Sequence, residues 1–183
     1  IRFVASADGS LFINNGIIEI TDDLEFYGES CEFRNNGSVS IVENMILLLV
    51  DNNLITNNYG ASFTIAGYFD ANDRKFTIDN YGDFVLGDDF RDMQPGEVIV
   101  NNRAGTFTWN GDDCDPQLVL RCSFESNEFI YGRNGNQDII IPDDNYWNLT
   151  TATSGTKLLS SDIQITNALK ITGNSTLHTS YSY

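Results

Sequence analysis

The stretch Asn14-Asn15-Gly16 returns along the chain at a nearly constant interval. The related corners are Asn35-Asn36-Gly37, Asn57-Asn58-Tyr59-Gly60, Asp79-Asn80-Tyr81-Gly82 and Asn101-Asn102-Arg103-Ala104-Gly105. The second residue of each pair is an asparagine at position 15, 36, 58, 80 or 102, so the steps are 21, 22, 22 and 22 residues. A fixed period of this size indicates stacked structural repeats.

Short segments with period-two alternation surround each corner, a pattern typical of strands. Those before the asparagines are Leu11–Ile13, Cys31–Arg34, Leu54–Thr56, Phe76–Ile78 and Val98–Val100. Those after the glycine are Ile17–Ile20, Ser38–Ile41, Ser62–Ile65, Asp83–Leu86 and Thr106–Trp109. A third set follows a polar or glycine-containing turn: Leu24–Tyr27, Met45–Val50, Tyr68–Phe69, Phe90–Met93 and Leu118–Leu120. No stretch has helical periodicity.

Three short strands and three corners in about 22 residues predict one coil of a parallel β-helix. We therefore expect an all-β, right-handed solenoid, with the hand set by the crossover preference. Regular coils with Asn-Asn-Gly corners are expected over residues 1–122, and less regular coils of the same solenoid over residues 123–183. About seven or eight coils, stacked at about 4.8 Å, would make a rod roughly 35 Å long. The pattern runs up to both ends, so we expect a piece of a longer chain.

The repeated asparagines predict a structural ladder. Their side-chain amides can bond one another when the same corner recurs in successive coils. Asparagine also tolerates the left-handed backbone region, and the following glycine is expected to supply a positive φ that restarts the strand. The expected ladder residues are Asn15, Asn36, Asn58, Asn80 and Asn102.

The charge of the chain limits its partners. Acidic residues outnumber basic residues 26 to 10, which gives a net charge of −16. Such a chain repels nucleic acid and anionic lipid. The longest apolar run, Met45–Val50, has the length of a strand, so no direct membrane insertion is expected.

Acidic residues recur about eight to twelve positions after the first asparagine, at one expected corner of the coil. One interpretation is a calcium site, because Ca²⁺ prefers oxygen ligands. The other is a solvated acidic edge with no resident cofactor, which the Ala66-Gly67 interruption and the lack of an EF-hand loop favour. The residues concerned are Asp22, Asp23, Glu43, Asp88, Asp89, Asp112 and Asp113.

The three cysteines form no complete disulfide framework. Cys114 and Cys122 are close enough in sequence to close one loop, which would leave Cys31 as a buried thiol. The alternative is three unbridged thiols. The single histidine, His178, leaves no Cys/His zinc set.

Two groups of side chains could act on or bind sugars. Arg91 lies near Asp88 and Asp89, and Arg121 lies near Asp112 and Asp113; each group is either a surface ion pair or an acid–base pair. We favour ion pairs and expect no catalytic residue. Tyr59 and Tyr81, which are 22 positions apart, either pack across coils or offer a platform for a sugar ring.

Residues 145–177 carry a resemblance. The run contains Asn145-Tyr146-Trp147-Asn148-Leu149-Thr150, Ser154-Gly155-Thr156-Lys157-Leu158-Leu159, Ile163–Ile171 and Ser175-Thr176-Leu177. It resembles the "Tyr-Tyr-Asn-Leu-Thr … Ser-Gly-Thr-Lys-Thr-Leu … Val-Asn-Gly-Asn-Leu-Thr-Ile … Ala-Thr-Leu" run of very large secreted surface proteins of Bacteroidota. The sorting domain that those proteins carry at their C-terminus is not found in this sequence.

The resemblance implies a β-helical adhesin segment at the bacterial cell surface, in a class often exported by the type IX route. We therefore expect a non-enzymatic, extracellular rigid stalk or binding rod. Its partners would be the flanking coils of the parent protein and glycans or other surface proteins. Two alternatives stay open: a carbohydrate-active β-helix enzyme, either lyase or glycosidase, and a cargo or accessory component of a secretion or gliding machine.

Overall fold

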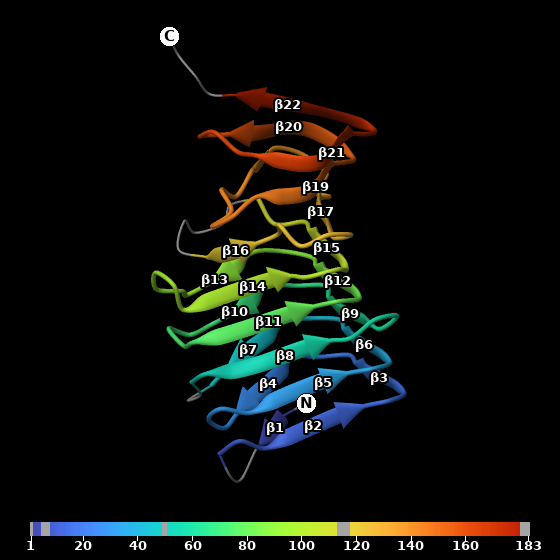
Figure 1. Cartoon of the computed structure of the whole chain (residues 1–183). Coiled ribbons are helices and arrows are strands. Elements are labelled where there is room, and N and C mark those ends of the chain that lie inside the picture. Colours follow the sequence, from blue (N-terminus) through green and yellow to red (C-terminus); the bar gives the residue numbers. More distant parts are fainter. Residues whose placement is uncertain (1, 5–7, 49–50, 113–117, 180–183) are drawn as a thin grey trace.

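A computed structural model describes residues 2–4, 8–48, 51–112 and 118–179. The described residues form strands and no helix, and the chain winds upward in stacked coils from the N-terminus (Figure 1). None of these residues therefore belongs to a helix that is long and apolar enough to cross a membrane.

Three parallel sheets form the three faces of the stack, and successive strands along the chain enter successive sheets. Sheet A contains β1 (Arg2–Val4), β4 (Leu24–Tyr27), β7 (Met45–Leu47), β10 (Phe69–Asp70) and β13 (Phe90–Arg91). Sheet B contains β2 (Leu11–Asn14), β5 (Glu32–Asn35), β8 (Asn53–Asn57), β11 (Phe76–Asn80), β14 (Val98–Asn102) and β16 (Val119–Arg121). Sheet C contains β3 (Ile17–Ile20), β6 (Ser38–Ile41), β9 (Ser62–Ile65), β12 (Asp83–Leu86), β15 (Thr106–Trp109), β17 (Glu128–Tyr131), β19 (Tyr146–Thr151) and β21 (Ile165–Ile171).

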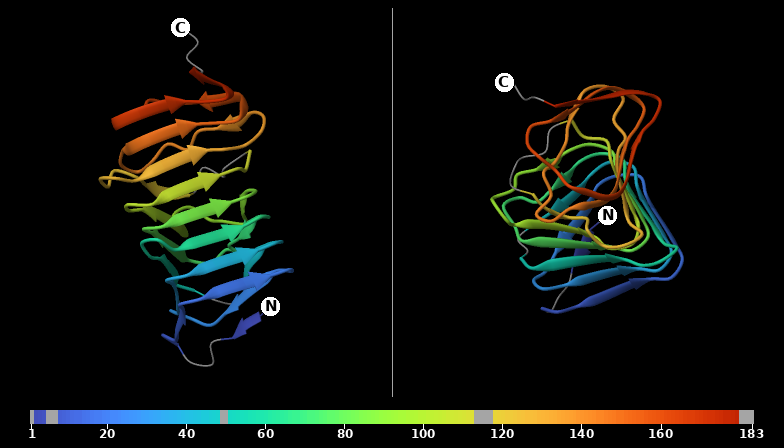
Figure 2. Two further views of the ribbon diagram at one scale, coloured as in Figure 1. Left: turned by 90° about the vertical axis from the view of Figure 1, so that its right-hand side faces the viewer. Right: turned by 45° about the horizontal axis from the view of Figure 1, so that its top comes forward.

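The expected parallel β-helix is confirmed. The strands of sheet B cross the front of the stack from left to right while the chain rises, so the solenoid is right-handed (Figures 1 and 2). Paired residues lie from 19 positions apart, as for Tyr146 and Ile165, to 24 positions apart, as for Val39 and Phe63. Corners of different length account for most of this variation, and a register shift between Tyr146 and Asn148 adds to it.

The coils change character after Cys122. A fourth sheet, D, contains β18 (Gln137–Asp138), β20 (Ser154–Leu159) and β22 (Asn174–Thr179), and the chain then alternates between sheets C and D. Three strands per coil thus give way to two, and from β19 onward these strands have six or seven residues. The segment Leu118–Leu120, expected as a third strand, instead starts the next coil, because Val119 pairs with Ile99 in sheet B.

The interior is filled by columns of apolar side chains from successive coils. In sheet C the rings of Phe63, Phe84, Phe107 and Phe129 stack almost in parallel, with neighbouring centroids 4.9–5.2 Å apart. All four side chains are buried. Because each coil adds one ring to this column, the core grows by one layer with each coil.

Candidate functional site

A buried ladder of asparagine side chains runs through five coils. The Nδ2 atom of each residue donates to Oδ1 of the next at 2.8–3.0 Å, in the order Asn14, Asn35, Asn57, Asn80 and Asn102. Each Nδ2 also reaches a backbone carbonyl of the coil above, as from Asn57 to Asp83 at 3.0 Å. The ladder therefore ties every corner to the next strand of sheet C.

The predicted membership of this ladder was wrong by one position in three coils. Asn80 and Asn102 belong to it, but Asn15, Asn36 and Asn58 lie one residue later, in a second column on the outer surface. There Asn36 donates to Asn15 Oδ1 at 2.8 Å, and Asn58 donates to Asn36. The reason is corner length: strand register places Asn57 beside Asn80, although the sequence repeat aligns Asn58 with Asn80.

Glycine has a different role at these corners from the one expected. A Cβ atom on Gly37 would lie 2.0 Å from the carbonyl oxygen of Gly16, and one on Gly105 would lie 1.9 Å from that of Gly82. Among the corner glycines named above, a positive φ occurs only at Gly60, where it is 73°. The ladder asparagines are likewise absent from the positive-φ positions of the described chain. Close approach between coils therefore selects glycine at positions 37, 82 and 105, whereas a left-handed backbone selects it at Gly60.

The acidic residues divide into separate groups. Carboxylate oxygens of Asp22, Asp23 and Glu43 lie within 4.8 Å of one another. Asp23 Oδ1 accepts hydrogen bonds from the backbone and the side chain of Asn44, at 3.0 and 2.9 Å. This group offers the oxygen ligands that a hard cation prefers. In the next coil, Gly67 interrupts the acidic column, as the sequence indicated.

The upper acidic residues are held by partners of their own. Asp88 pairs with Arg91 at 3.1 Å, as expected for a surface ion pair. Asp89 Oδ1 accepts from the backbone N–H of Asp112 at 2.9 Å. Asp113 lies outside the described residues. Among the residues that the structure describes, Asp88, Asp89 and Asp112 are not part of the Asp22, Asp23 and Glu43 group.

The expected pairing of Arg121 is corrected. Its guanidinium lies 3.2 Å from Asp143, whereas Asp112 pairs with Arg133 at 2.9 Å. Residues 22 and 21 positions ahead provide these partners, because stacking brings the next coil closer than the neighbouring corner.

Cys31 and Cys122 are buried, and neither forms a disulfide with another described residue. Because Arg121 pairs with Asn101, the next residue, Cys122, lies one coil above Asn102, at the upper end of the buried ladder. Burial raises the pKa of the Cys122 thiol well above its ordinary value. Cys114 lies outside the described residues, so its pairing with Cys122 stays a prediction.

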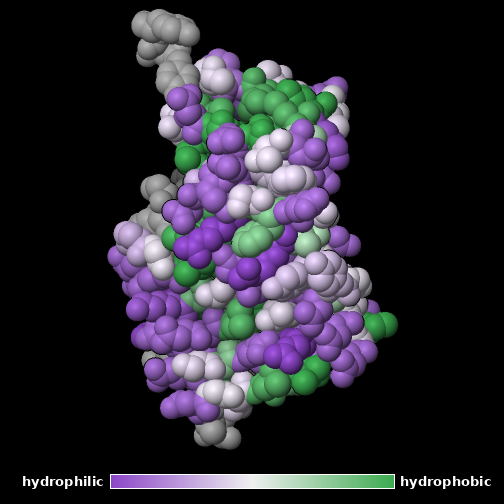
Figure 3. Space-filling model, viewed as in Figure 1, coloured by the Kyte–Doolittle hydropathy of each residue, from purple (hydrophilic) through white to green (hydrophobic). Residues whose placement is uncertain are grey.

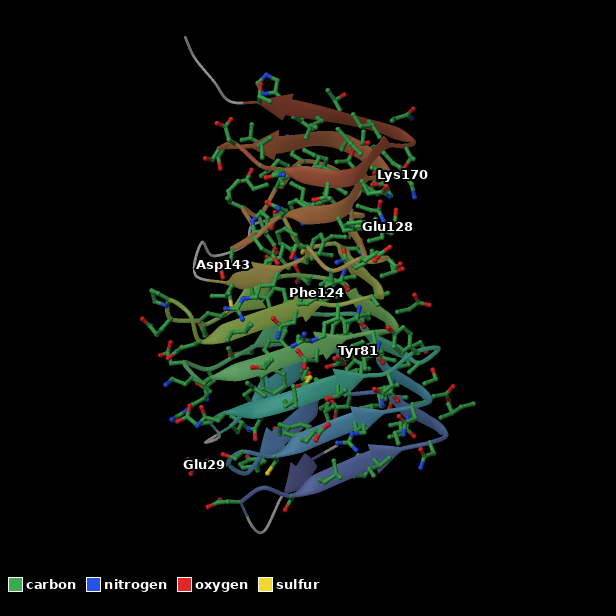
Figure 4. The ribbon with its side chains drawn as sticks, viewed as in Figure 1. Glu29, Tyr81, Phe124, Glu128, Asp143 and Lys170 are labelled. Atoms are coloured by element: carbon green, nitrogen blue, oxygen red, sulfur yellow. The ribbon has the colours of Figure 1, made fainter. Side chains whose placement is uncertain are left out.

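Two outward carboxylates are stabilised across coils. Glu32 accepts from Arg34 at 2.9 Å and from Thr56 at 2.9 Å, and the bond from Arg34 is the main cause of its lowered pKa. Burial acts to raise the pKa of Glu128, but bonds from Thr150 at 2.6 Å and Lys170 at 3.0 Å outweigh it, so the pKa is lowered. Figure 4 shows Glu128 and Lys170 near the same edge of the stack.

Tyr59 and Tyr81 contact each other on the outer surface, with ring centroids 5.6 Å apart and planes tilted by 44°. The expected cross-coil packing is therefore present. Tyr59 is 72% exposed. Whether the pair also binds a sugar stays a prediction.

A groove of about 460 Å³ lies on the outer face of sheet B, over β8, β11 and β14. Leu54, Thr77 and Ile99, the outward-facing residues of these strands, line it. Lys75 and Glu97 line its end at the start of the strands, and Asp79, Asn101 and Arg103 line the other end. This groove was not predicted from the sequence, because its residues come from three different coils and no local motif marks them.

Two buried polar residues were also missed. Lys157 is completely buried, and its Nζ donates to the carbonyls of Arg133 at 2.7 Å and Gly135 at 2.9 Å. Burial, together with the charge of Arg133, lowers its pKa. Asn127 is also buried, and it donates to the carbonyls of Asn102 and Cys122 at 2.8 and 2.7 Å, beside the upper end of the buried ladder. Both side chains satisfy backbone groups where the coils become irregular.

Comparison with known protein families, with curated proteins and with solved structures finds no match to this chain. The fold and the outer surface are thus the basis for the functional proposal.

Proposed function

We propose that this chain is a non-enzymatic segment of a large extracellular bacterial surface protein, where it acts as a rigid stalk or binding rod. The observation that carries the proposal is the continuous pairing of eight parallel strands in sheet C from β3 to β21, with one register shift, between Tyr146 and Asn148 of β19. Such a stack transmits its shape from one coil to the next, because each coil contacts mainly its neighbours. The repeated sequence therefore builds a rod whose length is set by the number of coils and whose stiffness comes from their stacking.

The ladders support the same proposal. The buried asparagine column links five coils through side-chain amides in addition to the backbone hydrogen bonds of the sheets. Amide ladders of this kind stabilise stacked strands. Bending the rod would stretch these bonds on one side, so the ladder resists bending.

The two end coils support a place within a longer stack. Phe12 is 36% exposed at the lower end, while Leu169 and Ile171 are 45% and 51% exposed at the upper end. Figure 3 shows green hydrophobic surface at the top of the stack, above the mainly hydrophilic middle. Flanking coils of the parent protein would cover these apolar residues and the open strand edges. The bacterial and extracellular assignment itself comes from the resemblance of residues 145–177.

A replacement experiment in the parent surface protein tests the stalk. This segment is exchanged either for an unrelated rigid solenoid of the same length or for a flexible Gly/Ser linker of 183 residues. We expect the rigid solenoid to retain cell attachment and the flexible linker to lose it. Equal attachment with the flexible linker would contradict the proposal, and release of oligosaccharides from glycans by the purified chain would favour the enzyme alternative.

A further inference from the structure

We propose that the groove over β8, β11 and β14 binds a neutral oligosaccharide along the length of β11. This inference deepens the binding-rod proposal and rests on it for the cellular setting, although the binding itself can be measured on the isolated chain. The groove has a volume of about 460 Å³, within the range of small-molecule sites.

The floor of the groove is mainly aliphatic, and its side chains come from adjacent strands, one strand spacing apart. Leu54, Thr77 and Ile99 point outward from three adjacent strands and are half-buried. Their side chains offer aliphatic surface between polar ends. The C–H face of a sugar ring packs on such a surface, while its hydroxyl groups point to the rim.

The polar groups of the groove retain hydrogen-bonding capacity. Asp79 Oδ1 accepts from Asn101 Nδ2 at 2.7 Å and lies 3.3 Å from Arg103 Nε, while Asp79 Oδ2 and Asn101 Oδ1 accept nothing from the described residues. At the other end, Glu97 Oε2 accepts from the backbone N–H of Gln94 at 2.8 Å. Within the described chain the ammonium group of Lys75 has no hydrogen bond or ion pair. Donors and acceptors are thus available at both ends.

The charge balance favours a neutral ligand. The groove is lined by two basic residues, Lys75 and Arg103, and by two acidic residues, Asp79 and Glu97. The chain as a whole carries a net charge of −16, which repels polyanions. A ligand rich in hydroxyl groups can use both donors and acceptors without introducing a charge.

An extended peptide fits the site less well. A peptide gains most of its affinity by adding to an open sheet edge, but β11 already pairs with β8 and β14 on its two sides. Only side chains are available above this part of sheet B, and side-chain amides, carboxylates and cations suit sugar hydroxyls.

Aromatic side chains border the Arg103 end. The guanidinium of Arg103 lies 5.0 Å from the centre of the Phe124 ring, which is 36% exposed. Tyr81 follows the end of β11 one coil below. Figure 4 shows both aromatic residues on the face that carries β8, β11 and β14. They would extend the apolar surface for a second sugar ring.

The spacing of the carboxylates favours binding over hydrolysis. Lys75 and Glu97 lie at one end of the paired strands and Asp79 at the other, four residues from Lys75. At about 3.3 Å per residue this separates Glu97 from Asp79 by about 13 Å along the strands. Glycosidases hold their two carboxyl groups at about 5–9.5 Å.

Titration calorimetry of the 183-residue chain tests the inference. The neutral probes are cellohexaose, mannohexaose and xylohexaose, and the acidic probe is a hexagalacturonate. We expect at least one neutral hexasaccharide to bind and the acidic one to bind at least tenfold more weakly. Thr77→Trp, which fills the floor, should weaken binding at least tenfold, and Lys75→Ala should weaken it severalfold without affecting folding.

The matched control is Thr108→Trp, on the outward face of sheet C away from the groove. Its affinity should equal that of the unsubstituted chain. The site is refuted if no neutral hexasaccharide binds, if only the acidic one binds, or if Thr77→Trp and Lys75→Ala both leave the affinity unchanged. Loss of sugar binding in a chain that remains a stiff rod would reject the groove and leave the stalk intact.

Discussion

The side-chain amide of Asn57 donates to Asn80 Oδ1 at 2.9 Å, although the two residues are 23 positions apart and the sequence repeat pairs Asn58 with Asn80. Asn57 is completely buried and also receives the amide of Asn35 at 2.9 Å. Asn58 lies in the outer column and bonds Asn36 near solvent. Adjacent residues with the same side chain therefore have different energetic roles.

Replacement of Asn57 by alanine should destabilise the fold strongly. It removes two buried ladder bonds, the one that Asn35 Nδ2 donates to Asn57 and the one that Asn80 Oδ1 accepts from it, at about 1–3 kcal/mol for each group left without that partner. We expect a loss of about 2–4 kcal/mol, measured by urea unfolding with the m-value fixed by the unsubstituted chain. Asn58→Ala is the control and should cost about 0.5 kcal/mol or less, because water replaces its partners. Equal losses of unfolding free energy for the two variants would show that the buried asparagine column stabilises the fold no more than the outer column does.

A second pair of variants separates close approach from backbone conformation at the corners. Gly37→Ala places a methyl group 2.0 Å from the Gly16 carbonyl oxygen, so the two coils must move apart. We expect a loss of several kcal/mol, since overpacking alone costs about 1–3 kcal/mol and the strand pairing is also disturbed. Gly16→Ala meets no atom within 4 Å and should change the free energy of unfolding by less than about 0.5 kcal/mol. The opposite order would contradict the assigned role of glycine.

The phenylalanine column gives a third expectation. Phe107 is buried between Phe84 and Phe129, with ring centroids 4.9 and 5.2 Å away. Phe107→Ala should cost about 3–5 kcal/mol, and Phe107→Leu should cost less because it leaves a smaller cavity. Thermal and urea unfolding of both variants provide the measurement. A cost below about 1 kcal/mol for alanine would mean that the coils do not share a packed interior.

Stability should also depend on pH through Glu32. Its pKa is lowered in the folded chain by the bond from Arg34. The unfolded chain therefore binds a proton at Glu32 more readily than the folded chain does. The stabilisation from Glu32 is present above its unfolded pKa and is lost as the pH falls through its folded pKa. Because Arg34 is 40% exposed, we expect only about 0.2–1 kcal/mol.

The control for Glu32 is Glu32→Gln, which removes the titrating group. The difference in unfolding midpoint between the two chains should be present at pH 7 and vanish at acid pH, below the folded pKa of Glu32. A difference that stays constant over this range would mean that the Arg34 bond is not electrostatic in origin.

The fold could be predicted from local pattern, whereas the groove could not. Segments such as Asp83–Leu86 and Thr106–Trp109 begin and end where the alternation indicated. Ladder membership was misassigned because it depends on register, and the corner Asn57–Ala61 is longer than the corner Asn35–Gly37. The groove was missed for another reason: its pairs, Lys75 beside Glu97 and Asp79 beside Asn101, are brought together by the repeat but lie in different coils. No local motif marks such neighbours, and Arg121 was misassigned for the same reason.

The central claim is that the coils form one stiff rod, and a distance measurement between spin labels tests it most directly. Glu19 and Lys170 are exposed in one outward column of sheet C, seven strand pairings apart. Labels introduced there through an encoded keto amino acid leave the cysteines untouched. At about 4.8 Å per pairing, we expect one narrow distribution centred near 34 Å.

Moving the lower label from Glu19 to Ser40, one coil higher in the same column, should shorten the mean distance by about 4.8 Å and keep the distribution narrow. That pair of results would establish a stiff stack with the assigned register. A broad distribution, or a mean that does not change by one strand spacing, would contradict it.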